Sequence, residues 1–232
     1  MADMRRACLK LVLAGLVAGC TPHISPPAVL EHLQAPADFP EAYYRHAEVL
    51  GTKVLRIDPG RSLVTIVVRR GGALARLGHD HVVASHDVRG YVDMAAGRAD
   101  LYVPLERLAI DEPALRSEAE LTTQPSQEAV EGTRRNMLEK VLESARFPFA
   151  LIHITRSIND SSKILVTITL HGTMQTFEIP AQAETMPGEL KISGIMTFNQ
   201  TDFGIIPLSI LGGALQVQDR LDLRFRILAG GN

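Results

Sequence analysis

The chain has 232 residues, of which 46% are hydrophobic, so it can bury one barrel-sized core or two small ones. Its 24 Lys and Arg residues nearly balance its 26 Asp and Glu residues, which leaves a formal net charge of -2. Because the sequence has neither a basic excess nor an aromatic-basic patch, we exclude a nucleic-acid-binding protein.

The first residues have the organisation of a secretory signal. Arg5, Arg6 and Lys10 make the beginning of the chain positive, and residues 11–19 (LVLAGLVAG) are apolar. Nine apolar residues are too few to span a membrane, which takes about 20 residues in a helix. We therefore predict a signal peptide over residues 1–19 rather than a transmembrane helix.

This segment ends in Val17-Ala18-Gly19-Cys20, which resembles the lipobox of bacterial lipoproteins. In that class the cysteine is acylated and becomes the new N-terminus; the alternative is an ordinary cleaved signal followed by an incidental cysteine. By the same resemblance, Thr21 in place of Asp favours the outer membrane. We predict lipidation of Cys20 and a lipid-anchored protein in the periplasm, attached at the outer membrane. With Cys8 removed and Cys20 acylated, the mature chain would contain no disulfide.

Residues 20–50 follow as a predicted tether. They contain five prolines between positions 22 and 40 and have little periodicity. Residues 43–50 could be a short helix or part of the first strand, and the sequence does not decide between them.

Residues 51–232 are predicted to form one β-rich domain. Apolar or β-branched runs are separated mostly by Gly, Pro, Asn or Asp, and this spacing indicates an antiparallel sandwich or barrel. The runs cover residues 53–57, 63–70, 82–92, 99–105, 149–155, 164–170, 176–184, 189–198 and 215–228.

The last run has the clearest strand pattern, because apolar residues such as Leu221 and Leu223 alternate with polar residues such as Asp222 and Arg224. One helix is predicted over residues 128–144, with Ser126 as its N-cap. The polar stretch over residues 110–127 is predicted to be a long surface loop.

The His79-Asp80-His81 cluster could hold a metal ion or contact a ligand. On a strand its two histidines would face the same side, about 6.6 Å apart along the chain. A zinc site needs a third protein ligand, for which His86, His153 and His171 are candidates; His153 shares the parity of Leu151 and would then face inward. Polar contact with a ligand head group and a purely structural role remain alternatives.

Several segments resemble the YceI-like family. They are residues 54–63 (VLRIDPGRSL), 137–154 (MLEKVLESARFPFALIHI), 166–179 (VTITLHGTMQTFEI) and 194–205 (GIMTFNQTDFGI), which occur in the family's order. The resemblance implies a lipocalin-like antiparallel β-barrel of about eight strands with one inserted α-helix. It also implies a periplasmic protein that binds amphipathic lipids such as polyisoprenoids. Gln200 and Thr201 stand where the family usually has a basic residue, which favours a different head group.

Inward-facing apolar residues of such a barrel would line a ligand cavity or fill it as an ordinary core. The predicted cavity wall includes Leu151, Leu221, Leu223, Phe225 and Ile227.

The leading functional hypothesis is a membrane-anchored protein that sequesters or carries a polyisoprenoid, quinone-like or fatty-acyl lipid. A zinc-like metal site or metal-dependent enzyme at His79 and His81, and a structural lipoprotein with a filled barrel, are the alternatives. The sequence contains no recognisable catalytic motif, so a non-enzyme is favoured; the ligand and any protein partners are not identified.

Overall fold

The computed structural model describes residues 34–158, 160 and 162–231, and the chain from Ala35 onward forms one compact unit. Cys20 and the predicted signal peptide over residues 1–19 lie outside the described residues. Among the helices that are described, none has the length and hydropathy needed to cross a membrane.

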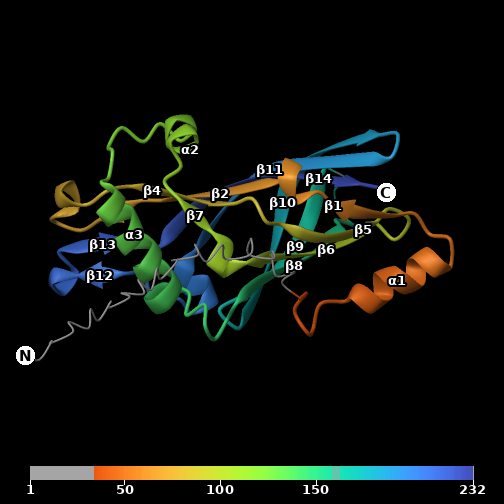
Figure 1. The fold of residues 1–232 in the computed structure, drawn as a ribbon, viewed down its shortest axis with the longest axis horizontal. Coiled ribbons are helices and arrows are strands. Elements are labelled where there is room, and N and C mark those ends of the chain that lie inside the picture. The colour runs from red at the N-terminus through yellow and green to blue at the C-terminus, as the bar shows by residue number, and fades with distance from the viewer. Residues whose placement is uncertain (1–33, 159, 161, 232) are drawn as a thin grey trace, which may run out of the picture. The chain divides into compact units, whose positions relative to one another are not determined.

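In the described part of the chain, eight strands close into an antiparallel barrel (Figure 1). In order around the barrel they are β1 (Val54–Ile57), β5 (Arg89–Asp93), β6 (Arg98–Pro104), β8 (Phe149–Arg156), β9 (Lys163–Leu170), β10 (Thr173–Met186), β11 (Glu189–Asn199) and β14 (Arg220–Gly230). The ring closes where Arg56 and Ile57 of β1 pair with Gly230 and Ala229 of β14. The predicted lipocalin-like barrel is therefore confirmed.

The edge of β14 that pairs with β1 also pairs with a second strand, β2 (Leu63–Val68). From β2 the sheet continues through β4 (His81–Ser85) to β7 (Ala109–Ile110). Along this edge of β14, the barrel wall therefore continues into β1 at one end of the barrel and into β2, β4 and β7 toward the other end. The β-branched sequence of β2, LVTIVV, suits this position because branched side chains pack well on a pleated sheet.

A small sheet and a helix lie at the β2–β4 end of the barrel. The sheet contains β12 (Ser209–Ile210), β13 (Leu215–Val217) and β3 (Arg70–Gly71). The helix α3 (Gln127–Asn136) continues into the π-helix η4 (Met137–Val141), and Figure 1 shows α3 beside these elements. Ser126 is the N-cap as predicted, since its hydroxyl accepts a hydrogen bond from the amide of Ala129 at 3.2 Å.

Three predicted segments are divided or structured differently. The run over 82–92 is two strands, β4 and β5, and the run over 215–228 is divided between β13 and β14 at Asp219. The predicted loop over 110–127 contains the helix α2 (Pro113–Glu118). This helix was missed because its sequence, PALRSE, has little apolar periodicity; its Arg116 is nevertheless buried.

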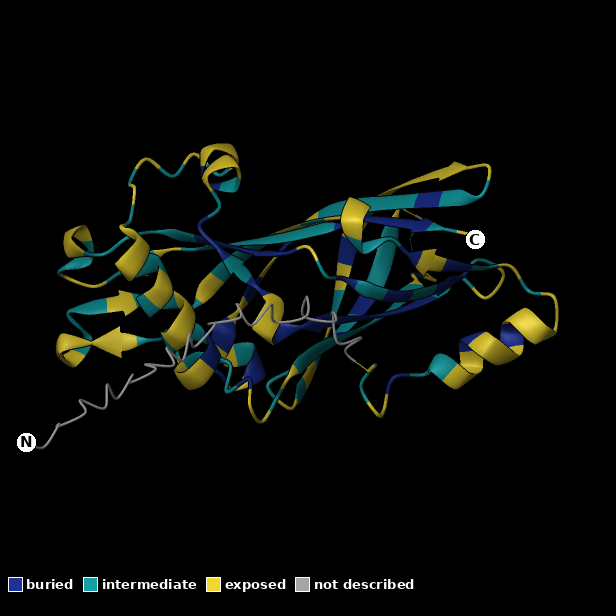
Figure 2. Cartoon of the chain, in the orientation of Figure 1, coloured by how far each residue is buried: buried dark blue, intermediate teal, exposed yellow. Residues whose placement is uncertain are grey.

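The helix α1 (Glu41–Val49) packs against the outside of the barrel, mostly exposed to solvent but with a buried strip (Figure 2). Tyr44 is fully buried, stacks on Tyr91 at 5.1 Å and donates a hydrogen bond to Asp100 at 2.5 Å. Residues 35–50 therefore belong to the compact unit and not to a tether. The tether prediction was too long because it was based on proline content, which does not reveal an aromatic anchor.

Candidate functional site

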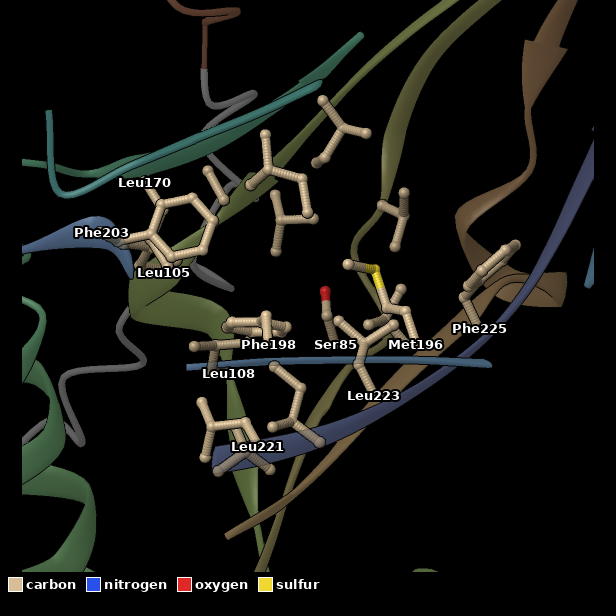
Figure 3. A pocket seen from close by; sticks show the side chains of 18 of the residues that line it. Ser85, Leu105, Leu108, Leu170, Met196, Phe198, Phe203, Leu221, Leu223 and Phe225 are labelled. Atoms are coloured by element: carbon tan, nitrogen blue, oxygen red, sulfur yellow. The ribbon is translucent and has the colours of Figure 1, made fainter. Parts of the chain in front are cut away.

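The interior of the barrel contains a cavity of about 270 Å³. Its wall is formed by inward-facing side chains of the barrel strands, of β2 and β4, and of α3 and η4. Almost all of these side chains are apolar, as Figure 3 shows for the region around Met196, Phe198 and Leu223. The polar residues on the wall are His81, Ser85, Thr133 and Gln200. The site is therefore a hydrocarbon-lined space with a few oriented polar groups, which is typical of ligand pockets.

Cross-strand rows of apolar residues build the wall. Met196 of β11 pairs with Leu223 of β14, which pairs in turn with Ile66 of β2 and, through it, with Val83 of β4. All four of these residues line the cavity. Because side chains of a strand alternate between its two faces, directly paired residues in neighbouring strands point to the same side.

The structure places four of the five predicted wall residues on the cavity. Leu221, Leu223, Phe225 and Ile227 all line it, as the alternation along β14 predicted.

Leu151 does not line the cavity, and this prediction is corrected. In β8 the cavity-facing residues are Ala150, Ile152 and Ile154, whereas Leu151 pairs with Tyr102 on the outer face. The sequence of β8, FALIHITR, is apolar at both parities, so its alternation could not distinguish the inner face from the outer face.

A glycine makes room for the largest predicted wall residue. Phe225 lies opposite Gly194 in the register of β11 and β14, and a Cβ at Gly194 would be 2.7 Å from the Phe225 ring. The ring therefore covers the Gly194 backbone and narrows the cavity at this level. A larger residue at position 194 would displace the ring.

A buried polar cluster stands at the α3 end of the cavity. The Nδ1 atom of His81 lies 2.5 Å from Oδ2 of Asp111, whose other oxygen accepts a hydrogen bond from the guanidinium of Arg116. The backbone amide of Val82 also donates to Asp111, at 3.1 Å. The side chains of Asp111 and Arg116 are 1% and 7% exposed, so the two charges neutralise each other away from water.

The charge on Asp111 determines which atom donates in its contact with the His81 ring. Burial raises the pKa of Asp111, but hydrogen bonds from His81, the Val82 amide and Arg116 outweigh it, and the net pKa is below the ordinary value. An ionised carboxylate can only accept hydrogen bonds, so Nδ1 of His81 must carry the hydrogen. In the neutral ring Nε2 is then an acceptor; it lies 3.4 Å from the Thr133 hydroxyl of α3.

The other polar wall residues are already held by the protein. Gln200 is buried and donates from its side-chain amide to the Gln218 carbonyl at 2.8 Å. The hydroxyl of Ser85 accepts from the Asp87 amide at 3.3 Å and lies among hydrocarbon side chains (Figure 3). Gln200 thus places an uncharged amide on the cavity wall.

His79 and His81 come close together, but a metal site does not form around them. Their ring centroids are 6.3 Å apart, and His79 Nδ1 is buried without a hydrogen-bond partner. Within the described residues no group of three His, Cys, Asp or Glu side chains is arranged to hold a metal ion. Among the described residues, no third ligand therefore lies beside the two histidines.

The proposed third ligands are all engaged elsewhere. His153 lies on the outer face of β8, where its Nδ1 is 2.7 Å from Asp100, so it points away from the cavity that His81 lines. His86 pairs with Glu112 at 2.7 Å, and His171 with Glu143 at 3.3 Å. Only His81 of these histidines belongs to the cavity wall.

Asp111, Arg116 and Thr133 were not identified from the sequence. They come from the end of β7, from α2 and from α3, and only the folded chain brings them to His81. Asp111 has a left-handed backbone, with φ of 57°, a conformation that Asp adopts more readily than most residues, but the sequence around it does not reveal this.

A solved structure with a TM-score above 0.5 supports this fold. A polyisoprenoid binding domain from Saccharophagus degradans is similar, with a TM-score of 0.55 at 11% identity over 78% of this chain and 99% of that domain. BcnA of Burkholderia cenocepacia gives a TM-score of 0.49 at 12% identity, covering 74% of this chain and 98% of that chain. The YCEI protein of Campylobacter jejuni gives 0.43 at 12% identity, covering 63% and 82%.

No curated protein matches the sequence. The family model for the YceI-like domain, in contrast, matches residues 55–229, which include every strand of the closed barrel except the ends of β1 and β14. The barrel, its inserted helix and this match together show that the chain belongs to the YceI-like family.

Proposed function

We propose that this protein binds an amphipathic lipid, with the apolar chain of the lipid in the barrel cavity and its polar head beside His81 and Thr133. The observation that carries this proposal is the cavity itself: about 270 Å³ enclosed almost entirely by hydrocarbon, with an imidazole and a hydroxyl at one end. An apolar chain gains about 25 cal/mol for each Å² that it removes from water. The hydroxyl or imidazole can then orient a head group by hydrogen bonding.

The candidates for the ligand are a polyisoprenoid, a quinone-like molecule and a fatty-acyl lipid. The relative from Saccharophagus degradans is described as a polyisoprenoid binding domain, which supports the first of these. The cavity wall carries His81, Thr133 and Gln200 as hydrogen-bonding groups and contains no lysine or arginine, which favours a head group recognised by hydrogen bonds. A barrel filled by its own core, the structural alternative, is disfavoured by the empty volume.

Native mass spectrometry of the mature domain, purified without detergent, tests the proposal. We expect an added mass that solvent extraction releases as a lipid. A protein that carries no lipid and takes up none of the three candidate classes would contradict lipid binding, and a retained metal ion would instead revive the role of His79 and His81.

We infer further that the protein is a lipoprotein of the periplasm, anchored at the outer membrane through Cys20. The basic and apolar composition of residues 1–19 and the lipobox-like sequence before Cys20 support this inference.

The Cys20→Ser variant tests the anchor. It should lose acylation and should no longer partition into a detergent phase, because the thiol that carries the lipid is absent. Membrane fractionation of both proteins provides the measurement, and a Cys20→Ser variant that remains with membranes would contradict the lipobox interpretation.

A further inference from the structure

Large aliphatic side chains are exposed on two loops at the α3 end of the barrel. Leu77 lies in the 3-10 helix η2 (Ala75–Leu77) and is 60% exposed. Ile210 of β12 is 48% exposed and Leu211, which opens the 3-10 turn η6 (Leu211–Gly213), is 67% exposed. We call these two loops, residues 70–79 and 205–217, the apolar tip. Figure 1 shows β12 and β13 beside α3, at the end opposite α1, and Figure 2 shows exposed residues at the ends of these strands.

The two loops of the apolar tip are joined into one surface. The amide of Leu74 donates to the carbonyl of Ala214 at 2.7 Å. Gly72 approaches the same carbonyl so closely that a Cβ on it would be 2.5 Å away. A Cβ on Gly78 would likewise be 2.9 Å from the side chain of Leu215, which pairs with Ile210. The exposed aliphatic side chains are therefore presented together and not on independent loops.

The apolar tip continues into the cavity. The amide of Val217 donates to the carbonyl of Leu208 at 2.9 Å, and both residues line the cavity. Along β13, Leu215 lies beside the exposed Ile210 while Val217, on the same face two residues on, reaches the cavity wall. His81 is the first residue of β4 and follows closely after the first loop of the tip. The polar end of the cavity, which contains His81, therefore lies at the same end of the barrel as the apolar tip.

The charges of the apolar tip have one sign. Residues 70–79 and 205–217 contain Arg70 and Arg76 and no Asp or Glu. Arg70 is paired with Asp80 at 3.7 Å, whereas Arg76 is exposed and has no ion pair with any described residue. Aliphatic side chains next to an unpaired cation suit the surface of an anionic bilayer, where the apolar groups enter the interface and the cation meets phosphate.

We propose that the apolar tip docks on an anionic lipid bilayer and that lipids enter the barrel there. This inference deepens the proposed lipid-binding function, because it specifies the surface from which the lipid comes. The unpaired Arg76 beside the exposed Leu and Ile side chains, and the continuity of this surface with the apolar cavity, favour a bilayer over a protein partner.

Tryptophan fluorescence tests the docking directly, since the chain contains no tryptophan. In full-length Leu77→Trp, brominated lipids in vesicles of phosphatidylethanolamine and phosphatidylglycerol should quench the new fluorophore and shift its emission to the blue. Ile210→Trp, on the other loop, provides the same test if Leu77→Trp does not fold. The matched control is Leu50→Trp at the α1 end, where the side chain is 70% exposed; its emission should stay unquenched. Equal quenching at both ends, or none at the tip, would overturn the proposal.

A transfer assay separates docking from lipid binding. The double variant Leu77→Asp/Leu211→Asp should take up a fluorescent polyprenol from these vesicles at least about tenfold more slowly, since about 1.4 kcal/mol is tenfold and burying one Leu is worth at least that much. Its uptake of the same lipid from cyclodextrin should be unchanged. If the wild type takes up no lipid from either source while the Leu77→Trp fluorophore is quenched by the vesicles, the proposed function fails and docking stands. If the double variant instead disrupts a dimer of the wild type, the tip is an interface between two copies and docking is overturned.

Discussion

The barrel contains two histidine–aspartate pairs, one on each face of its wall. His81 and Asp111 are 2.5 Å apart at the inner cavity, and His153 and Asp100 are 2.7 Å apart on the outer face. In both pairs the carboxylate is buried and its pKa is below the ordinary value, although burial alone would raise it. The hydrogen-bond chemistry is the same, but the surroundings differ.

The outer pair fastens a helix, whereas the inner pair faces an empty space. Asp100 also accepts hydrogen bonds from Tyr44 of α1 at 2.5 Å and from Arg98 at 2.7 Å, so the outer cluster holds α1 to the barrel. The inner cluster ends at His81 Nε2, which approaches only Thr133, at 3.4 Å. The comparison shows that a buried histidine–aspartate pair is no evidence of a binding site unless its free end faces a cavity.

The largest loss of stability is expected from neutralising the inner carboxylate, Asp111. Asp111→Asn retains a residue that tolerates the left-handed backbone but leaves the buried Arg116 without its counter-charge. Removing one partner of a buried ion pair costs about 3–5 kcal/mol. Urea denaturation should show this loss in the free energy of unfolding, and a loss below about 1 kcal/mol would contradict the assigned pair.

Neutralising the outer carboxylate, Asp100, should reduce stability less. In Asp100→Asn the partners Arg98 and His153, whose side chains are 31% and 42% exposed, can turn to water. We expect a cost of about 1.5–3 kcal/mol, typical of a hydrogen bond to a charged group. The same urea measurement compares the two variants, and a larger loss for Asp100→Asn would reverse the proposed ranking.

Acid should destabilise the protein through both pairs. The folded pKa values of Asp100 and Asp111 are below the ordinary value of 3.8, so their contribution is present above that pH and is lost as the pH falls through the lower folded values. Denaturation midpoints at neutral pH and near pH 3 should therefore differ, and the difference should be smaller in Asp111→Asn. An unchanged difference would indicate that Asp111 is not ionised in the folded protein.

The smallest effect is expected on lipid affinity, from a substitution at the proposed head-group contact. His81→Leu removes one hydrogen-bonding group from the cavity and should weaken lipid binding by about 2- to 10-fold. His153→Leu is the matched control, because it removes the outer histidine and should leave lipid affinity unchanged. Fluorescent-lipid titration provides the measurement, and equal effects of the two substitutions would show that His81 has no direct contact with the ligand.

The sequence predicts those strands in which apolar and polar residues alternate strictly. In β14 the apolar residues Leu221, Leu223 and Phe225 alternate with charged residues, and this alternation predicts correctly that they face the inside of the barrel. In β8 both parities are apolar because outer residues such as Phe149 pack against Tyr102, at 5.9 Å. There the alternation carries no information, and Leu151 and His153 were assigned to the wrong face.

The polar end of the site could not be predicted, because it depends on tertiary contacts between short segments. Arg116 lies in a polar stretch that has the composition of a surface loop, yet it is 6% exposed and bound to Asp111. The sequence does not decide on the helix α1 for a similar reason: its anchor, Tyr44, gains that role only from contacts with Tyr91 of β5 and Asp100 of β6.

The central claim is that the inner face of β14 lines a space for lipid, and one pair of substitutions tests it. Leu223→Trp should partly fill the cavity, change the free energy of unfolding by less than about 1 kcal/mol and sharply weaken uptake of a fluorescent lipid. Arg224→Trp, on the outer face of the same strand, should change neither quantity. If the face is a close-packed core, Leu223→Trp should instead cost about 1–3 kcal/mol or more. A strongly destabilised Leu223→Trp, together with a wild type that takes up no lipid, would contradict the account.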